Sequence, residues 1–247
     1  MTPDALAALT APPEPPSRRG DTVRMVLRGI GQTFITLGLV VLLFCVYELY
    51  FTGLYTKQQQ HNLTKDLNQT WTQQPTAPDP LHPPKYVVGT GIARIWFPTL
   101  GKNVHYVVVE GVSHDDLKKG PGHYPTSAAI GAIGNVVISG HRTTYLAPFN
   151  RVDELKDGDP IVLETQGAWF TYTVTSESVV QPTAIEVTYP VPYHLGQKPT
   201  KRLLTLTTCN PKYSARTRLI VHATLSATLP KGPGVVPPAL VPVLKAA

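Results

Sequence analysis

One uncharged run near the N-terminus constrains the chain more than any other feature. Residues 29–47 read GIGQTFITLGLVVLLFCVY, 19 residues without a charged side chain. As a helix rising about 1.5 Å per residue, this run spans about 28 Å, close to the thickness of a bilayer's hydrocarbon core. The sequence therefore predicts one membrane-spanning anchor, which we place at residues 29–51. Aromatic residues suited to the outer interface follow its apolar stretch: Tyr47, Tyr50, Phe51 and Tyr55.

Basic residues predict the orientation of this anchor. Four arginines precede the run, at positions 18, 19, 24 and 28, whereas the first basic residue after it is Lys57. The positive-inside rule then places the N-terminus in the cytoplasm and the rest of the chain outside a plasma membrane crossed once. A cleaved signal peptide is disfavoured, because the run exceeds the usual apolar region and no small-x-small cleavage site follows. A buried core helix would leave the arginine asymmetry unexplained.

Prolines divide the remaining chain. Fifteen of the 25 prolines fall in residues 1–16, 75–84 and 230–242, and proline fixes φ and lacks an N–H, so it collects outside regular structure. We therefore expect a disordered cytoplasmic tail at 1–28, a polar and proline-rich extracellular linker at 52–84, a folded domain at 85–229 and a disordered tail at 230–247. The anchor and spacers partly explain why only 15% of residues are charged, against about 25% in soluble domains.

The folded domain is predicted to be mostly β. Seven runs rich in Val, Ile, Thr and aromatic residues are separated by Gly, Pro or Asp-Gly punctuation. Seven or more strands over residues 85–229 favour a closed barrel or a sandwich. One short helix is expected at Ser113–Lys119, with Ser113 as N-cap and Asp116 in the capping-box position. The predicted strands are 93–97, 104–109, 135–139, 161–164, 170–180, 202–208 and 218–225.

Several classes of ligand are disfavoured. Lys and Arg number 22 against 16 Asp and Glu, but no block of five like charges exists, so no nucleic-acid partner is expected. The histidines at 105, 114 and 123 lie nine residues apart, without H-x-H or HExxH spacing or a supporting cysteine pair. Glu110, Asp115 and Asp116 do not reproduce an EF-hand loop. We therefore expect no metal and no cofactor.

The two cysteines point to chemistry. Cys45 lies in the predicted anchor and Cys209 in the outer domain, which makes a disulfide between them implausible, so Cys209 is expected to be a free thiol. Free thiols are unusual outside the cell. A thiol becomes a nucleophilic thiolate beside an imidazole or guanidinium. His141 closes the apolar strand NVVISGH, Cys209 closes RLLTLTTC, and Arg218 opens the strand that follows.

Each of these residues also has a structural interpretation. A cysteine at a strand end is often a small buried hydrophobe, His141 could be a satisfied polar residue, and Arg218 a surface charge. The short connection of residues 210–217 places Cys209 and Arg218 at one mouth of a hairpin. The local pattern leaves the position of His141 in space open.

Three segments together resemble the sortase family of bacterial cysteine transpeptidases. They are LKKGPGHYP (117–125), GNVVISGHRTTYLAPFNRVDELKDGDPIVLET (134–165) and LLTLTTCNPKYSARTRLIVHA (203–223). The resemblance implies a closed eight-stranded β-barrel, with His141, Cys209 and Arg218 as the catalytic residues. Arg216 competes with Arg218, but it does not directly precede L-I-V. Papain-like enzymes place Cys before His, and the S-x-G-C motif of L,D-transpeptidases is missing from the sequence.

Within this family, the single anchor, the proline linker and the GPGHYP and GHRTTY segments resemble class E. That class prefers a Leu-Ala-x-Thr-Gly sorting signal where class A takes Leu-Pro-x-Thr-Gly. The resemblance implies cleavage of such a C-terminal signal on secreted proteins between Thr and Gly, and transfer through a Cys thioester to an amine of a peptidoglycan precursor. It also suggests Tyr124 as the reader of the second position. Thr208, beside Cys209, is a candidate for a hydrogen bond to substrate, although half-buried packing and β-propensity would also explain these two residues.

One alternative of a different class stays open. A non-catalytic, membrane-tethered wall-binding β-domain would use the same anchor and linker. A thiol oxidoreductase is disfavoured, because the sequence contains no C-x-x-C.

Overall fold

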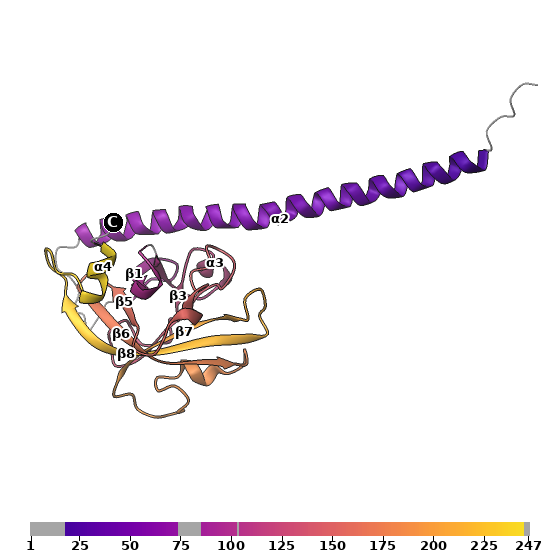
Figure 1. The fold of residues 1–247 in the computed structure, drawn as a ribbon. Helices are drawn as coiled ribbons and strands as arrows, with labels where there is room; N and C mark the ends of the chain where they lie inside the picture. The colour runs from indigo at the N-terminus through magenta and orange to yellow at the C-terminus, as the bar shows by residue number, and fades with distance from the viewer. Residues whose placement is uncertain (1–17, 74–84, 103, 245–247) are drawn as a thin grey trace, which may run out of the picture. The chain divides into compact units, whose positions relative to one another are not determined.

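The computed structural model describes residues 18–73, 85–102 and 104–244, with only the backbone of residues 18–19 and 48–52. By contacts the chain divides into two units, residues 1–48 and 49–247. The second unit contains a closed barrel of eight strands, in the order β1-β2-β3-β4-β7-β8-β6-β5 (Figure 1). The strands are β1 (Gly91–Trp96), β2 (His105–Glu110), β3 (Gly122–His123), β4 (Gly134–Ser139), β5 (Pro160–Glu164), β6 (Ala168–Val180), β7 (Arg202–Asn210) and β8 (Thr217–Pro230).

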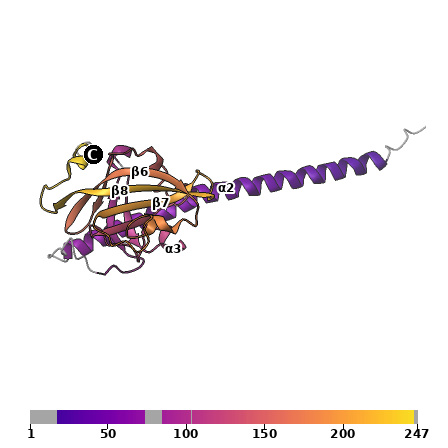
Figure 2. The same ribbon diagram turned by 90° about the horizontal axis from the view of Figure 1, so that it is seen from below.

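This architecture confirms the predicted closed eight-stranded barrel. β2–β3 and β4–β7 pair in parallel, and the other neighbours are antiparallel. β7, β8 and β6 lie side by side as the longest strands (Figure 2). Alternate side chains point inward, and the interior is filled by aliphatic and aromatic residues, among them Phe97, Ile138, Phe149, Tyr172 and Leu206.

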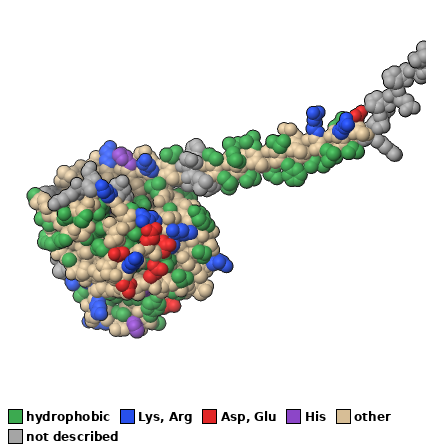
Figure 3. All heavy atoms as spheres, in the orientation of Figure 1, with side chains coloured by type: hydrophobic (Ala, Val, Ile, Leu, Met, Phe, Trp, Pro, Cys, Tyr) green, Lys and Arg blue, Asp and Glu red, His purple; other side chains and the backbone are tan. Residues whose placement is uncertain are grey.

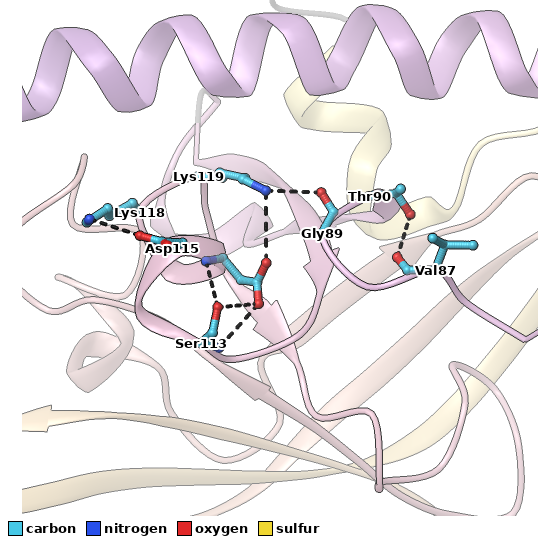
Figure 4. A network of polar contacts seen from close by, with 8 residues as sticks. Val87, Gly89, Thr90, Ser113, Asp115, Lys118 and Lys119 are labelled. Carbon is cyan, nitrogen blue, oxygen red and sulfur yellow. Dashed lines mark hydrogen bonds and ion pairs between the residues drawn. The ribbon is translucent and has the colours of Figure 1, made fainter.

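Seven strands match the predicted runs with shifts at their ends. The eighth, β3, was not predicted. It has only two residues, in a glycine- and proline-rich segment, which is too short to show an alternation of apolar and polar side chains. The short helix α3 (His114–Leu117) has the predicted capping box between Ser113 and Asp116. Figure 4 shows this region, where Lys119 donates a hydrogen bond to the carbonyl oxygen of Gly89, 3.3 Å away. Three 3₁₀ helices also connect strands: η1 (Pro98–Leu100), η2 (Val152–Glu154) and η3 (Ile185–Thr188).

The first unit contains the start of one long helix, α2 (Arg18–Gln73). Its segment Gly20–Tyr47 is long and apolar enough to cross a membrane, and Figure 3 shows hydrophobic side chains along its surface. Residues 18–28 are therefore helical rather than part of a disordered tail, because the helix extends beyond the apolar run. Residues 1–17 of the expected tail lie outside the described residues.

In the second unit, the first part of the expected linker 52–84 is helical too. α2 continues to Gln73, and Leu63 and Leu67 are buried against Val107 and Val109 of β2. Gln60 hydrogen-bonds both the N–H and the carbonyl oxygen of Val107, at 2.7 and 3.0 Å. The contacts recur at helical spacing, so a mostly polar sequence still forms a docked helix. The proline cluster at 75–84 lies outside the described residues.

The C-terminal segment also departs from the expected disordered tail at 230–247. A 3₁₀ turn, η4 (Pro238–Leu240), leads into a short helix, α4 (Val241–Leu244). Leu240 is fully buried against Val162 and Trp169 on the outside of the barrel. Burial of this leucine holds residues 238–244 against the barrel, although the proline content of this segment predicted disorder. Residues 245–247 are not among those described.

Candidate active site

Strand pairing brings His141, Cys209 and Arg218 to the same end of the barrel. β4 and β7 run in parallel, and Ser139 is paired with Thr207 at the end of the ladder. His141 and Cys209 each follow two residues later in their own chain segments. β7 and β8 are antiparallel, and Cys209 is paired directly with Arg218. The central strand β7 therefore has the histidine on one side of the cysteine and the arginine on the other.

Cys209 lies on the outer face of the barrel. Leu204 and Leu206 of β7 belong to the interior core, so by alternation Thr205, Thr207 and Cys209 face outward. The thiol of Cys209 is free, and the residue is half-buried. This position combines partial shielding with access from solvent, which suits a nucleophile better than a buried structural cysteine.

The turn that presents His141 is built from hydrogen bonds to β7. The Gly140 N–H donates to the carbonyl oxygen of Thr207 at 3.1 Å, and the Thr208 hydroxyl donates to the carbonyl oxygen of Gly140 at 2.7 Å. A Cβ at position 140 would lie 2.7 Å from the ring of Phe149, so only glycine fits here. The Phe149 N–H donates to the carbonyl oxygen of His141 at 3.1 Å. The Gly-His pair is thus fixed locally by packing and backbone hydrogen bonds.

The imidazole of His141 is half-buried and contacts the ring of Tyr145. The Tyr145 ring lies 4.9 Å from the His141 ring between centroids, and His114 of α3 lies beyond Tyr145, 6.4 Å from its ring. Burial and, secondarily, the charge of His114 hold the pKa of His141 below its ordinary value. Nε2 of His141 is buried and has no hydrogen-bond partner among the described residues.

Arg218 is half-buried at the start of β8. One guanidinium nitrogen donates to the carbonyl oxygens of Ala215 and Thr217, each at 3.0 Å. These bonds occupy one nitrogen of a group with five N–H donors. Arg216, the competing arginine, is exposed in the loop between β7 and β8.

The two expected substrate-binding residues lie in different settings. Thr208 is buried and lies on the same inward face of β7 as Leu204 and Leu206. Its hydroxyl donates to the carbonyl oxygen of Gly140. That geometry favours support of the His141 turn over direct contact with substrate. Tyr124 is half-buried just after β3, and its N–H donates to the carbonyl oxygen of Val137 on β4 at 2.9 Å. Tyr124 is therefore one strand away from β7.

Sequence reasoning missed an ion-pair cluster beside the site. Arg142, next to His141, is buried and pairs with Asp153 at 2.9 Å, and Lys212 of the β7–β8 loop approaches the same carboxylate at 3.7 Å. Asp153 thus contacts both segments that leave the candidate site. The motif GHR contains Arg142, but the spacing along the chain gave no sign of its partner.

It also missed a buried polar network on the outer face of β7. The Thr205 hydroxyl donates to Asn135 Oδ1 at 2.7 Å and lies 2.9 Å from His222 Nδ1. The Asn135 amide donates to the carbonyl oxygens of Val187 and Tyr189, both at 3.1 Å. Because the Thr205 proton goes to Asn135, its oxygen accepts from Nδ1–H of His222, which fixes that tautomer. The network ties the loop of residues 181–201 to the strands.

This loop encloses a hollow at the other end of the outer face. The hollow has a volume of about 380 Å³, and its lining includes Tyr193, Lys201, Leu203 and His222. Burial lowers the pKa of His222 below its ordinary value. Five residues of β7 separate Leu203 from Cys209, so the hollow is distinct from the cysteine end of the barrel.

No group of three or more His, Cys, Asp or Glu side chains in the described part of the chain is placed to hold a metal ion. The three predicted catalytic residues contribute a thiol, an imidazole and a guanidinium to this end of the barrel.

A free cysteine between a histidine and an arginine, on the outer face of a closed barrel, defines a candidate cysteine-dependent acyl-transfer site. Comparison with known proteins identifies the family. Residues 96–226 match the model of the sortase domain, which is more than half of the chain. The chain therefore belongs to the sortase family of cysteine transpeptidases.

Individual relatives agree with this assignment. Sortase SrtE1 of Streptomyces coelicolor is 33% identical over 226 residues, which cover 88% of this chain and 62% of that protein. The solved structure of sortase E from Streptomyces avermitilis is 42% identical, with a TM-score of 0.57, and the match covers 63% of this chain and 99% of that one. Sortase E1 from Streptomyces coelicolor, solved with a tripeptide in the active site, is 38% identical with the same TM-score, covering 62% and 98%.

Proposed function

We propose that the chain is a membrane-anchored sortase that uses Cys209, His141 and Arg218 to cleave a C-terminal sorting signal between Thr and Gly. The observation that carries the proposal is the strand register, which sets Cys209 opposite Arg218 and continues β4 to His141 at the same barrel end. Membership in the family indicates the reaction class, and we place the site on the outer face of the barrel.

The proposed reaction is acyl transfer in two steps. The Cys209 thiolate attacks the Thr–Gly carbonyl carbon, the C–N bond breaks, and protonated His141 gives its proton to the departing glycine amine. A thioester remains on Cys209. An amine of a peptidoglycan precursor then attacks the thioester, His141 takes a proton from that amine, and Cys209 leaves as thiolate. The enzyme returns to its starting state with one amide bond exchanged for another.

Protonation limits the active fraction of the enzyme. The reaction needs thiolate and imidazolium together. For a thiol and an imidazole with the reference pKa values of about 8.5 and about 6.5, only about 1% of molecules hold both charges at intermediate pH. Burial and the charge of His114 lower the pKa of His141, which reduces this fraction further. We therefore expect turnover to be slow.

Arg218 is assigned to the developing oxyanion or to the substrate backbone. It faces Cys209 across the β7–β8 ladder, and a guanidinium can donate several hydrogen bonds in a fixed plane. Thr208 is assigned to hold the Gly140 turn. Tyr124 is proposed to contact the second residue of the signal.

The substrate is proposed to be a Leu-Ala-x-Thr-Gly or Leu-Pro-x-Thr-Gly signal on a secreted protein. Sortase E1, a relative of this chain, was solved with a tripeptide in its active site, which supports a peptide substrate. The apolar segment Gly20–Tyr47 would anchor the enzyme in a single pass, with the N-terminus in the cytoplasm and the barrel outside. With the barrel outside the membrane, the enzyme would have access to both secreted proteins and wall precursors.

Cleavage of a fluorogenic Leu-Ala-x-Thr-Gly peptide tests the proposal. We expect Cys209→Ala to reduce cleavage to background, and Arg218→Ala to reduce kcat/KM by about a hundredfold or more. Arg218→Lys should also be slow, because an ammonium lacks the planar fork. Arg216→Ala is the matched control, since this exposed neighbour should leave the rate unchanged. Normal cleavage by Cys209→Ala would overturn the nucleophile assignment, and no cleavage by the parent protein would favour the non-catalytic wall-binding β-domain.

A further inference from the structure

The loop after His141 contains an unusual backbone. Tyr145, Leu146 and Ala147 are three consecutive non-glycine residues with positive φ, at 51°, 62° and 44°. Each such residue carries a steric cost and persists only where the surrounding structure imposes it. Elsewhere in the described residues, positive φ at a non-glycine residue occurs singly, at Tyr193 and Tyr213.

Hydrogen bonds from both ends hold this strained loop. The Ala147 N–H donates to the carbonyl oxygen of Thr144 at 2.8 Å, which closes a turn around Tyr145. The Asn150 side chain donates to the carbonyl oxygen of Arg142 at 2.9 Å. The loop is therefore folded back toward the residue from which it departs.

The result of this fold is a ring contact with His141. The ring centroids of His141 and Tyr145 are 4.9 Å apart, with an interplanar angle of 41°. The Tyr145 ring also meets His114 edge to face, at an interplanar angle of 89°. Tyr145 is half-buried, and its ring contacts both the candidate catalytic histidine and the second imidazole.

His141 has few other partners that could favour its charged form. The ionisable groups near it in the fold are Tyr145 in its own loop, His114 on α3, Cys209 on β7 and Arg218 on β8. The next residue, Arg142, is paired with Asp153, which Lys212 also approaches. No carboxylate forms an ion pair with His141 in the described part of the chain, and its Nε2 is buried without a hydrogen bond there. The aromatic ring is thus the neighbour with a negative face.

We propose that Tyr145 is a positioning residue for the transpeptidase reaction, whose ring orients the His141 imidazole and stabilises its imidazolium form through a cation–π contact. This inference rests on the proposed function of His141. Burial and the charge of His114 act in the opposite direction on the pKa of His141, so the ring offsets part of their effect.

The test compares pH profiles of kcat/KM for three variants. Tyr145→Phe keeps the ring and should stay within about twofold of the parent enzyme, whereas Tyr145→Leu removes it. Loss of the ring lowers the pKa of His141. The acid limb of the profile should then move to lower pH by about half to one unit, and the plateau should fall by about three- to tenfold. Tyr213→Leu is the control, because this tyrosine also has positive φ but is 89% exposed.

A shape-preserving substitution separates the ring's electrostatics from its packing. Replacing Tyr145 with pentafluorophenylalanine keeps the ring but reverses its quadrupole, and it should shift the profile in the same direction as Tyr145→Leu. If Tyr145→Leu and the fluorinated variant both match Tyr145→Phe, the inference is overturned. It is also overturned if the variants raise only KM.

The pH dependence of iodoacetamide alkylation at Cys209 gives the same comparison without substrate. We expect the profile of Cys209 alkylation to change in Tyr145→Leu and not in Tyr213→Leu. If no peptide is cleaved by the parent protein while this difference persists, the proposed substrate fails and the role of Tyr145 stands. Equal alkylation profiles in an enzyme that cleaves peptide would contradict the role of Tyr145 alone.

Discussion

At the scale of single residues, the candidate site depends on two proximities. One could be predicted from the sequence, and the other could not. Cys209 and Arg218 lie across a hairpin, so their proximity follows from a short connection. His141 reaches Cys209 through a parallel pairing of β4 with β7, which has no local sequence signal. Only the resemblance of the GHR and TLTTC segments to a known family linked the two. Tyr145 and Asp153 lie in segments that carry this resemblance, but nothing in the sequence indicated which residues they contact.

His114 offers a direct test of how the site controls its histidine. His114→Gln removes one of the two causes that lower the pKa of His141, so that pKa should rise toward its ordinary value. Imidazolium then persists to higher pH, the acid limb of kcat/KM moves up by about half a unit or less, and the plateau rises by up to about threefold. The pH–rate profile checks this, and an acid limb that moves down would contradict the assigned effect of His114.

At the scale of elements, strands were easier to predict than the segments that pack on them. The β runs alternate and are rich in Val, Ile and Thr, so their positions could be read directly. The second half of α2 looked like a polar linker, because only Leu63 and Leu67 along it are buried apolar residues. These two leucines and a polar contact, the two hydrogen bonds of Gln60 with Val107, together attach the helix to β2.

This docking predicts that the helix stabilises the barrel. In a soluble chain beginning at residue 53, Leu67→Ala should lower the free energy of unfolding by about 2 to 3 kcal/mol, since it leaves a cavity against β2. Leu54→Ala is the matched control, because Leu54 is 61% exposed on the same helix. Urea denaturation of the two variants measures the difference. Equal midpoints would show that the helix does not contribute.

At the scale of the whole molecule, the sequence predicted a barrel with an apolar N-terminal helix, and the structure contains both. The number of predicted strands favoured a barrel or a sandwich. That the sheet closes into a barrel was implied only by the family resemblance. The sortase-domain match over residues 96–226 agrees with the barrel that the strands form. The expected disorder at the C-terminal end does not hold for residues 238–244, because proline content alone does not reveal a buried side chain such as Leu240.

The thioester on Cys209 is the central claim, and intact-protein mass spectrometry detects it most directly. The full-length chain in detergent, mixed with a Leu-Ala-x-Thr-Gly peptide and quenched in acid, should gain the mass of the peptide up to its threonine, located by digestion to Cys209. Added hydroxylamine should remove this mass, and Cys209→Ala should never acquire it. Cleavage of the peptide by the parent chain with no adduct on Cys209, or with an adduct on another residue, would contradict the account.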